Sequence, residues 1–174
     1  MASVFTRDGN GRIVTLESFF TLFPGLENSY RMLFGGKVLE IVDEVSGSLA
    51  TLFVGTPGHQ AVHVGEEVLF LQPILAGEAG KVAARVVLGT EKIVCVHVVV
   101  SGGDLQRPET FTTRYEGFGI CAILDPRGAM VRTLEPYDDG TDIARIARTV
   151  IEFQRSLRKQ LQEMDARQRV DTRS

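Results

Sequence analysis

The sequence predicts an α+β fold in which an antiparallel β-sheet wraps around one long central helix, with a second helix added at the C-terminus. Apolar residues recur at helical spacing between Gly36 and Gly55. Four segments rich in Val, Ile and Phe follow, and turn-forming residues separate them. A second helical repeat begins at Thr141. The 174 residues, 44% of them hydrophobic, suit one domain with a substantial core.

The N-terminal part of the chain predicts a short strand between two breaks. Asp8-Gly9-Asn10-Gly11 is a strong turn signal, and the β-branched content of Arg12–Leu16 is typical of a strand. Phe23-Pro24-Gly25 marks the next break. The long helix follows, and its apolar stripe consists of Val38, Val42, Val45, Leu49 and Leu52, widened by Ile41 and Phe53. A stripe of this width needs a sheet to cover it.

The predicted strands of the sheet are Ala61–Leu71, Lys81–Leu88, Lys92–Val100 and Phe111–Leu124. Turn residues between them indicate an antiparallel meander. The third strand is apolar on both faces except at His97, so we expect it at the centre of the sheet. A sheet whose concave face packs on one long helix has the hotdog architecture. The other face is also partly apolar, which favours a homo-oligomer.

The C-terminal tail predicts a helix that is capped by Thr141 or Asp139. Apolar residues follow one narrow seam at alternating spacings of three and four, and Gln160 fills one position: Ile143, Ile146, Val150, Phe153, Leu157 and Met164. Such a seam packs on one partner, either the sheet of the same chain or the tail of another subunit. We therefore divide the chain into a body, residues 1–136, and a helical tail, residues 137–174.

Composition and charge indicate the compartment and the kinds of partner that we expect for this protein. The N-terminus shows no apolar stretch of signal-peptide length, and no apolar run approaches the roughly 20 residues that span a bilayer. Cys95 and Cys121 lie in strand-like segments and suit buried thiols in a reducing compartment. The net charge is −3, and both signs are interspersed along the basic tail. We expect a cytoplasmic protein that binds neither nucleic acid nor membrane.

The segment from Asn28 to Gly47 contains the residues that are candidates for catalysis and binding. Gly35 and Gly36 open the helix, so its first N–H groups can meet a carbonyl oxygen or an anion; alternatively the two glycines only allow a tight turn. Asp43 is a carboxylate in an apolar helix, which indicates either a functional or a structural group. Its face of the helix is a lane of small residues that lets a sheet or a narrow ligand approach: Gly36, Ser46, Gly47 and Ala50.

This segment resembles the signature of the hotdog acyl-CoA thioesterases, or acyl-CoA hydrolases: Asn-x-x-Gly-x-x-Phe-Gly-Gly, then Asp in a Met-Asp-Glu-Val-Ala-Gly-like context. The matching positions are Asn28, Phe34, Gly35, Gly36, Asp43, Glu44, Val45 and Gly47. Downstream, Phe70-Leu71-Gln72-Pro73 with Gly77-Glu78 resembles the family's Phe-x-x-Pro-x-x-x-Gly-Asp. The resemblance covers most of the body, so residues 1–136 are expected to form a thioesterase-like hotdog domain.

The resemblance implies hydrolysis of acyl-CoA thioesters. On the matching positions Asp43 acts as nucleophile or general base, Asn28 positions the thioester or the water, and the two commonly meet across a dimer interface. CoA lies in a groove between subunits, and the residues expected to bind substrate are Phe34, Gly35, Gly36, Ser46, Gly89 and Thr90. No metal or cofactor is implied, because coenzyme A is part of the substrate. The expected assembly is a homodimer or a hexamer built as a trimer of dimers.

Two residues depart from the family pattern. Arg31 stands where the family has Gly, and crowds the turn before the helix. Lys92 stands where the family has Ser, after Gly89 and Thr90, in a region that lines the CoA groove; it either meets a CoA phosphate or is an exposed residue at the start of a strand. These departures keep a second function open, a non-catalytic hotdog protein that binds acyl-CoA or serves as an oligomeric scaffold.

The remaining candidates are weaker. His59, His63 and His97 show no metal-ligand spacing, and we expect each to be a satisfied core or interface residue without a catalytic role. Glu66 can help to position water, although a solvated strand residue is the simpler interpretation. A hotdog dehydratase or hydratase needs a His base near the helix. The segment 22–25 resembles such proteins faintly, but no His precedes or opens this helix.

Overall fold

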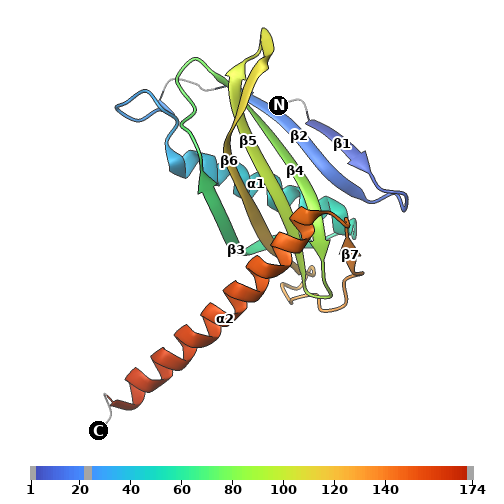
Figure 1. Ribbon diagram of the computed structural model, residues 1–174. Helices are drawn as coiled ribbons and strands as arrows, with labels where there is room; N and C mark the ends of the chain where they lie inside the picture. The colour runs from blue at the N-terminus through green and yellow to red at the C-terminus, as the bar shows by residue number, and fades with distance from the viewer. Residues whose placement is uncertain (1–2, 22–24, 172–174) are drawn as a thin grey trace.

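The computed structural model describes residues 3–21 and 25–171, and these form seven strands and two helices. The strands are β1 (Ser3–Arg7), β2 (Ile13–Thr21), β3 (Gln60–Phe70), β4 (Ala79–Gly89), β5 (Ile93–Asp104), β6 (Arg107–Leu124) and β7 (Tyr137–Asp138). The helices are α1 (Gly35–Val54) and α2 (Asp142–Asp171). Helix α1 lies across one face of the sheet, and α2 starts on the other face and extends beyond the body (Figure 1). The break predicted at Phe23 and Pro24 lies outside the described residues.

The turn predicted at Asp8–Gly11 joins β1 and β2 in an antiparallel hairpin. The Asp8 carboxylate organises this turn, because its Oδ1 accepts hydrogen bonds from the N–H groups of Asn10 and Arg12, both at 2.9 Å. The predicted strand at residues 12–16 is confirmed and continues to Thr21. Strand β1 was not predicted, because all of its residues are exposed and no buried apolar face marks it in the sequence.

Helix α1 confirms the predicted long helix and supplies the centre of the core. Its buried face includes Val38, Val42, Val45, Leu49 and Phe53. Complete burial of a side chain such as Leu49 stabilises the fold by about 1.5–3 kcal/mol. The helix ends at Gly55, whose φ of 63° lies in the left-handed region and whose N–H donates to the Thr51 carbonyl oxygen at 3.1 Å.

The sheet has the order β1-β2-β4-β5-β6-β3, with β7 paired to β4 and all pairs antiparallel. The prediction of a central strand is confirmed, since β5 lies between β4 and β6 and packs on both faces, with Val96 towards α1 and Cys95 towards α2. The predicted meander is wrong for its first strand. Only β4, β5 and β6 are successive neighbours, and β3 pairs with β6 at the edge of the sheet.

The connection between β3 and β4 explains why these strands do not form a hairpin. It runs beside the loop that precedes α1 and not back along β3. The Leu33 N–H donates to the Ile74 carbonyl oxygen, and the Ala76 N–H donates to the Arg31 carbonyl oxygen, both at 2.8 Å. Turn residues in a sequence indicate that the chain turns, but they do not specify which strand becomes the neighbour.

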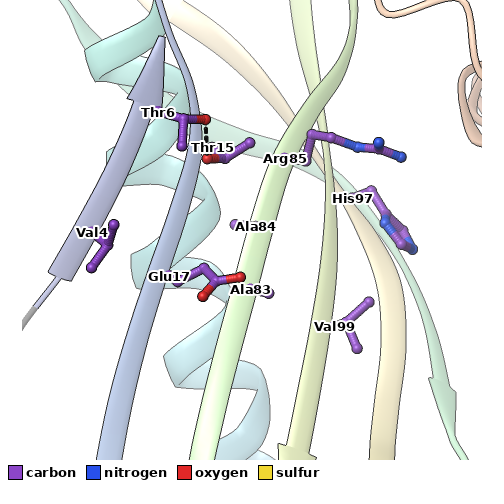
Figure 2. Close-up of a pocket in the computed structure, with 9 residues that line it drawn as sticks. All are labelled: Val4, Thr6, Thr15, Glu17, Ala83, Ala84, Arg85, His97 and Val99. Atoms are coloured by element: carbon purple, nitrogen blue, oxygen red, sulfur yellow. Dashed lines mark hydrogen bonds between the residues drawn. The ribbon is translucent and has the colours of Figure 1, made fainter.

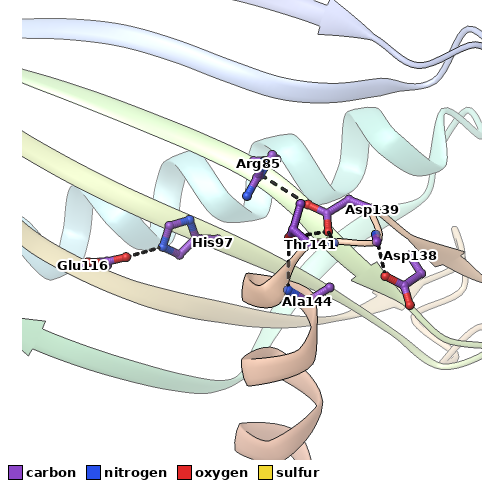
Figure 3. Close-up of polar contacts among 8 residues, drawn as sticks. Arg85, His97, Glu116, Asp138, Asp139, Thr141 and Ala144 are labelled. Carbon is purple, nitrogen blue, oxygen red and sulfur yellow. Dashed lines mark hydrogen bonds and ion pairs between the residues drawn. The ribbon is translucent and has the colours of Figure 1, made fainter.

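The C-terminal helix begins where the sequence predicts. Thr141 is the N-cap, since its hydroxyl oxygen accepts a hydrogen bond from the Ala144 N–H at 3.3 Å. Asp139 supports this cap: its Oδ1 accepts bonds from the N–H and the hydroxyl of Thr141 at 2.9 and 2.6 Å (Figure 3). The other carboxylate oxygen of Asp139 lies 3.3 Å from Nε of Arg85 on β4, which ties the start of α2 to the sheet.

Helix α2 packs on its own sheet along its N-terminal part only. Ala144, Ala147 and Ile151 are buried there against β4, β5 and β6. Further along the predicted seam, Phe153, Leu157 and Met164 are exposed. None of the helices in the part of the chain that the structure describes is long and apolar enough to cross a membrane. Cys95 and Cys121 are buried free thiols, as predicted.

Candidate active site

Asp43 lies on α1 at the boundary between the buried face of the helix and solvent. Val42 and Val45 pack in the core, whereas the Asp43 side chain is 63% exposed. Each residue of a helix is turned by about 100° from the one before it, which brings Asp43 to the flank of the buried face. There its Oδ1 lies 2.6 Å from Nδ1 of His63 on β3. The predicted catalytic carboxylate is therefore paired with an imidazole.

His63 has two polar partners, which agrees with the expectation of a satisfied histidine, but its contact with Asp43 was not predicted from the sequence. Its side chain is 19% exposed, and its Nε2 lies 2.8 Å from the hydroxyl oxygen of Ser46. No spacing rule connects His63 with Asp43, because one belongs to a strand and the other to a helix. The available signal is a polar residue between Val62 and Val64, in the apolar first part of the predicted strand.

A groove between α1 and β3 exposes the Asp43–His63 pair. The groove, which we call the α1–β3 groove, has a volume of about 790 Å³. It is lined by Asp43, Glu44, Gly47, Ser48, Thr51 and Leu52 from the helix and by Gln60, Ala61, Val62 and His63 from the strand. Among the described strands β3 is at the edge of the sheet, so the groove opens at the rim of the molecule. Its volume lies within the range of small-molecule sites.

The small residues beside Asp43 let the sheet come close to the helix. Ser46 is fully buried, and its hydroxyl donates to the Val42 carbonyl oxygen at 2.5 Å. A Cβ at Gly119 of β6 would lie only 2.6 Å from the Ser46 Oγ, so this position needs glycine. The lane of small residues accommodates the sheet at this point, and a substrate contact by Ser46 stays a prediction.

Asn28 organises the loop before α1. Its Oδ1 accepts hydrogen bonds from the N–H groups of Tyr30 at 2.9 Å and of Met32 at 3.2 Å. Arg31 has a φ of 59°, the left-handed conformation that glycine adopts most easily. Arg31 thus preserves the tight turn, with its side chain exposed. Among the described residues of one chain, no hydrogen bond joins Asn28 to Asp43.

The N-terminus of α1 presents Gly35 and Gly36 next to the exposed Phe34. Phe34 is the N-cap residue and contributes no side-chain hydrogen bond to the first turn. The first N–H groups therefore carry the positive end of the helix dipole without a side-chain cap. At a rise of about 1.5 Å per residue, Gly35 lies about 12 Å along the axis from Asp43. One chain does not bring these N–H groups and the Asp43 carboxylate to the same carbonyl group.

Gly89 and Thr90 form the turn between β4 and β5 and do not line the α1–β3 groove. The Thr90 N–H donates to the Ile93 carbonyl oxygen at 2.8 Å. The Thr90 hydroxyl accepts from the N–H groups of Lys92 and Ile93 at 3.3 and 3.2 Å. Lys92 is exposed beside this turn. Contact of these residues with substrate stays a prediction.

Two further acids lie near the Asp43–His63 pair. The Cys121 Sγ is 3.6 Å from Nε2 of His63, and burial, assisted by the charge of Asp43, raises the pKa of this thiol to about 12. Cys121 is therefore protonated at neutral pH and is not a nucleophile. Burial also raises the pKa of Glu66, against the opposing effects of the hydrogen bond from the Tyr115 hydroxyl, at 3.2 Å, and of His63.

A second hollow lies on the face of the sheet opposite α1 (Figure 2). It has a volume of about 470 Å³ and is lined by residues of β1, β2, β4 and β5, including Glu17, Arg85 and His97. None of the residues predicted for the site lines it. On the same face His97 pairs with Glu116 at 2.9 Å, which agrees with the expectation of a satisfied histidine (Figure 3). Within residues 3–21 and 25–171, no cluster of His, Cys, Asp and Glu is suited to hold a metal ion.

Solved structures of acyl-CoA hydrolases have the same architecture. An acyl-CoA hydrolase from Bacillus cereus aligns with a TM-score of 0.75 at 22% identity, over 87% of this chain and 92% of that one. An acyl-CoA hydrolase from Staphylococcus aureus, in complex with butyryl coenzyme A, coenzyme A and coenzyme A disulfide, aligns with a TM-score of 0.69 at 20% identity, over 90% and 93%. An apo hexameric acyl-CoA thioesterase aligns with a TM-score of 0.70 at 20% identity, over 84% and 91%.

The sequence matches no protein-family model, and no curated protein matches it at a significant level. The structural matches cover most of both chains at identities of 20% and 22%. The expected fold is confirmed: this chain has the hotdog fold of the acyl-CoA thioesterases, with a C-terminal helix added to it.

Proposed function

We propose that this protein hydrolyses acyl-CoA thioesters to a free acid and CoA in the α1–β3 groove. The observation that carries the proposal is the Asp43 carboxylate, which lines an open groove while Nδ1 of His63 holds one of its oxygens at 2.6 Å. Proteins named acyl-CoA hydrolase or thioesterase have the same fold, which supports this assignment. Since one fold hosts many activities, the proposal depends on the site and not on the fold alone.

One positioned carboxylate is sufficient because the carbonyl carbon of a thioester is electrophilic. As general base, Asp43 takes a proton from water while the water oxygen bonds to the carbonyl carbon and the C=O electron pair moves to oxygen. The C=O bond then re-forms, the C–S bond breaks, and the departing CoA thiolate takes the proton from Asp43. As nucleophile, Asp43 instead bonds to the carbonyl carbon and expels the CoA thiolate, which leaves a mixed anhydride. Water then hydrolyses the anhydride to the free acid and restores the carboxylate, and the thiolate takes up the proton that is released. Both routes need an ionised carboxylate that faces the groove.

The complete site belongs between two copies of the chain. The proposed partners of Asp43 are Asn28 and the N–H groups of Gly35 and Gly36, yet one copy separates Gly35 from Asp43 by about 12 Å along α1. A second copy that docks on β3 brings its own Asn28 loop and its own helix N-terminus, including Phe34, to the groove. Asn28 then positions the thioester or the water, and the N–H groups stabilise the developing oxyanion.

Strand β3 offers the surface for this pairing. It has 11 residues and lies at the edge of the described sheet, and Leu69 and Phe70 are exposed at its end. A long edge strand with exposed apolar residues readily pairs with another strand. We expect a homodimer or a hexamer built as a trimer of dimers. Light scattering on the purified protein checks this assembly, and a monomer at assay concentration would contradict a site shared by two chains.

The remaining predicted substrate contacts extend the site towards CoA. Ser46 lies behind His63, whereas Gly89 and Thr90 lie in a separate turn with Lys92 beside them. A lysine at that turn is suited to a CoA phosphate. The reaction needs no cofactor and no metal, because coenzyme A arrives as part of the substrate.

Thiol release from a panel of acyl-CoAs with short, long and aromatic acyl groups tests the proposed activity. We expect the wild-type protein to hydrolyse one class, and we expect Asp43→Ala to lose that activity while circular dichroism and oligomer size stay unchanged. Absence of turnover with every acyl-CoA, or wild-type activity in Asp43→Ala, would contradict the proposal.

A non-catalytic scaffold is the second candidate function. The observation in its favour is the exposed apolar seam of α2, which includes Phe153, Leu157 and Met164 and extends beyond the body (Figure 1). Such a seam binds another helix. This candidate predicts that acyl-CoA binds without turnover, or does not bind, in the same assay.

A further inference from the structure

His63 connects an exposed carboxylate to a buried hydroxyl. Its Nδ1 lies 2.6 Å from Asp43 Oδ1, and its Nε2 lies 2.8 Å from Ser46 Oγ. The contact with Ser46 is a hydrogen bond, and the contact with Asp43 brings the ring nitrogen within ion-pair distance of the carboxylate. The order Ser–His–Asp is familiar from hydrolases in which the serine attacks the substrate.

In this chain the serine is the most buried of the three residues and the carboxylate is the most exposed, which is the reverse of the order in those hydrolases. Ser46 is 0% exposed, the His63 side chain is 19% exposed, and the Asp43 side chain is 63% exposed. Ser46 also bonds to the Val42 carbonyl oxygen in its own helix. A substrate in the α1–β3 groove therefore meets the carboxylate and not the hydroxyl. Ser46 instead holds the His63 ring from its buried side.

The imidazole ring of His63 packs closely between α1 and β6. A Cβ at Gly119 would lie 3.0 Å from His63 Nε2, and a Cβ at Gly47 would lie 3.5 Å from His63 Cε1. The thiol of Cys121 is 3.6 Å from Nε2. Packing on both sides, the hydrogen bond at Nε2 and the carboxylate contact at Nδ1 fix the orientation of the ring, and hence the position of the Asp43 oxygen that it contacts.

The single proton of the Ser46 hydroxyl is donated to the Val42 carbonyl oxygen at 2.5 Å, so Nε2 of His63 is the donor in the 2.8 Å bond to Ser46 Oγ. On the other side of the ring, Nδ1 faces the Asp43 carboxylate at 2.6 Å. Glu66 of β3 and Cys121 of β6 are the other titratable groups near the ring.

We infer that His63 is a positioning residue for the reaction, anchored by Ser46, and that it occupies Asp43 Oδ1 so that Oδ2 is the oxygen presented to water or thioester. This inference rests on the proposed hydrolysis. It assigns a function to a residue that neither the family resemblance nor its spacing in the sequence identifies. Fixing one oxygen removes a freedom of rotation that would otherwise misplace the reacting atom, and a displacement of about 1 Å costs about 100-fold in rate.

Steady-state kinetics of two variants of His63 test the inference. We expect His63→Ala to lower kcat about 100-fold with a much smaller change in KM, because the ring acts on the reaction through the Asp43 carboxylate. Added imidazole should restore part of kcat, and His63→Asn should retain more activity than His63→Ala, since the Asn amide nitrogen occupies the place of Nδ1 and can donate to Oδ1. The matched control is His97→Ala, which removes another histidine paired with a carboxylate, on the opposite face of the sheet (Figure 3). Its kinetics should equal those of the wild type.

Three results for His63→Ala would overturn the inference. They are a kcat equal to that of the wild type, a change in KM with no change in kcat, and the absence of any rescue by imidazole. Nuclear magnetic resonance of the histidine side chains provides a measurement that needs no turnover. The wild type should show a slowly exchanging ring N–H that disappears in both His63→Asn and Asp43→Ala. If this signal is present and no acyl-CoA is hydrolysed, the proposed function fails and the hydrogen-bonded pair stands; if the signal is absent, the pair itself is wrong.

Discussion

Adding one methyl group at each of two glycines tests the packing around His63. In Gly119→Ala the new Cβ would lie 2.6 Å from Ser46 Oγ, 2.8 Å from Ser46 Cβ and 3.0 Å from His63 Nε2. These atoms belong to a side chain of α1 and to a ring that is held between Ser46 and Asp43, so they have little room to move. Overpacking of this kind costs about 1–3 kcal/mol.

The matched control is Gly47→Ala, which approaches the same ring from the helix. Its Cβ would lie 3.5 Å from His63 Cε1, an ordinary van der Waals contact. Replacing glycine by alanine inside a helix stabilises the fold by about 1 kcal/mol. The same chemical change should therefore destabilise the protein in β6 and stabilise it in α1.

Thermal unfolding followed by circular dichroism measures the difference. In a domain of this length each kcal/mol shifts Tm by about 2–4 °C, so the two variants should lie on opposite sides of the wild type. Thiol release should also fall in Gly119→Ala, because the ring is pushed from its position against Asp43. A Tm of Gly119→Ala equal to that of the wild type, or as high as that of Gly47→Ala, would refute this description of the site.

Three other predictions follow from local features. Arg31→Gly should stabilise the protein by up to about 1 kcal/mol in urea unfolding, because glycine adopts the φ of 59° without strain; a loss of stability would show that the Arg31 side chain makes a needed contact. Thr141→Ala should cost about 1 kcal/mol and speed hydrogen exchange in the first turns of α2, and unchanged exchange would argue against the cap. Burial raises the pKa of both Cys95 and Cys121 to about 12, so neither thiol should react with a disulfide reagent at pH 8 until the chain unfolds. Since an unfolded thiol ionises near its ordinary pKa of 9.0, stability should fall as pH rises from 9.0 towards 12, and a flat profile there would contradict the burial.

The sequence predicts the elements of this fold well because their signals are local. The stripe of Val42, Val45 and Leu49 follows the helical period, and one face of α1 is buried accordingly. Thr141 is a strong N-cap residue, and α2 begins directly after it. The topology is less predictable. Strand β3 pairs with β6 because of contacts between the connection after it and the loop before α1, which are distant in the sequence.

The site is predictable in part for the same reason. Asp43 is conspicuous as a carboxylate in an apolar helix, and its exposure at a groove agrees with that interpretation. His63 is not conspicuous, because its contact with Asp43 depends on how close β3 lies to α1. Arg31 illustrates the opposite case. The sequence suggests that arginine crowds this turn, whereas the backbone takes the left-handed conformation with arginine in place of glycine.

Comparison of Asp43→Ala with Glu44→Ala tests the central claim most directly. The two carboxylates are adjacent on α1 and line the same groove, so both variants remove one negative charge from it. Thiol release from the acyl-CoA that the wild type hydrolyses best should be lost in Asp43→Ala and retained in Glu44→Ala. Equal activity in the two variants, whether both lose it or both keep it, would contradict the assignment of Asp43 as the residue that carries the reaction.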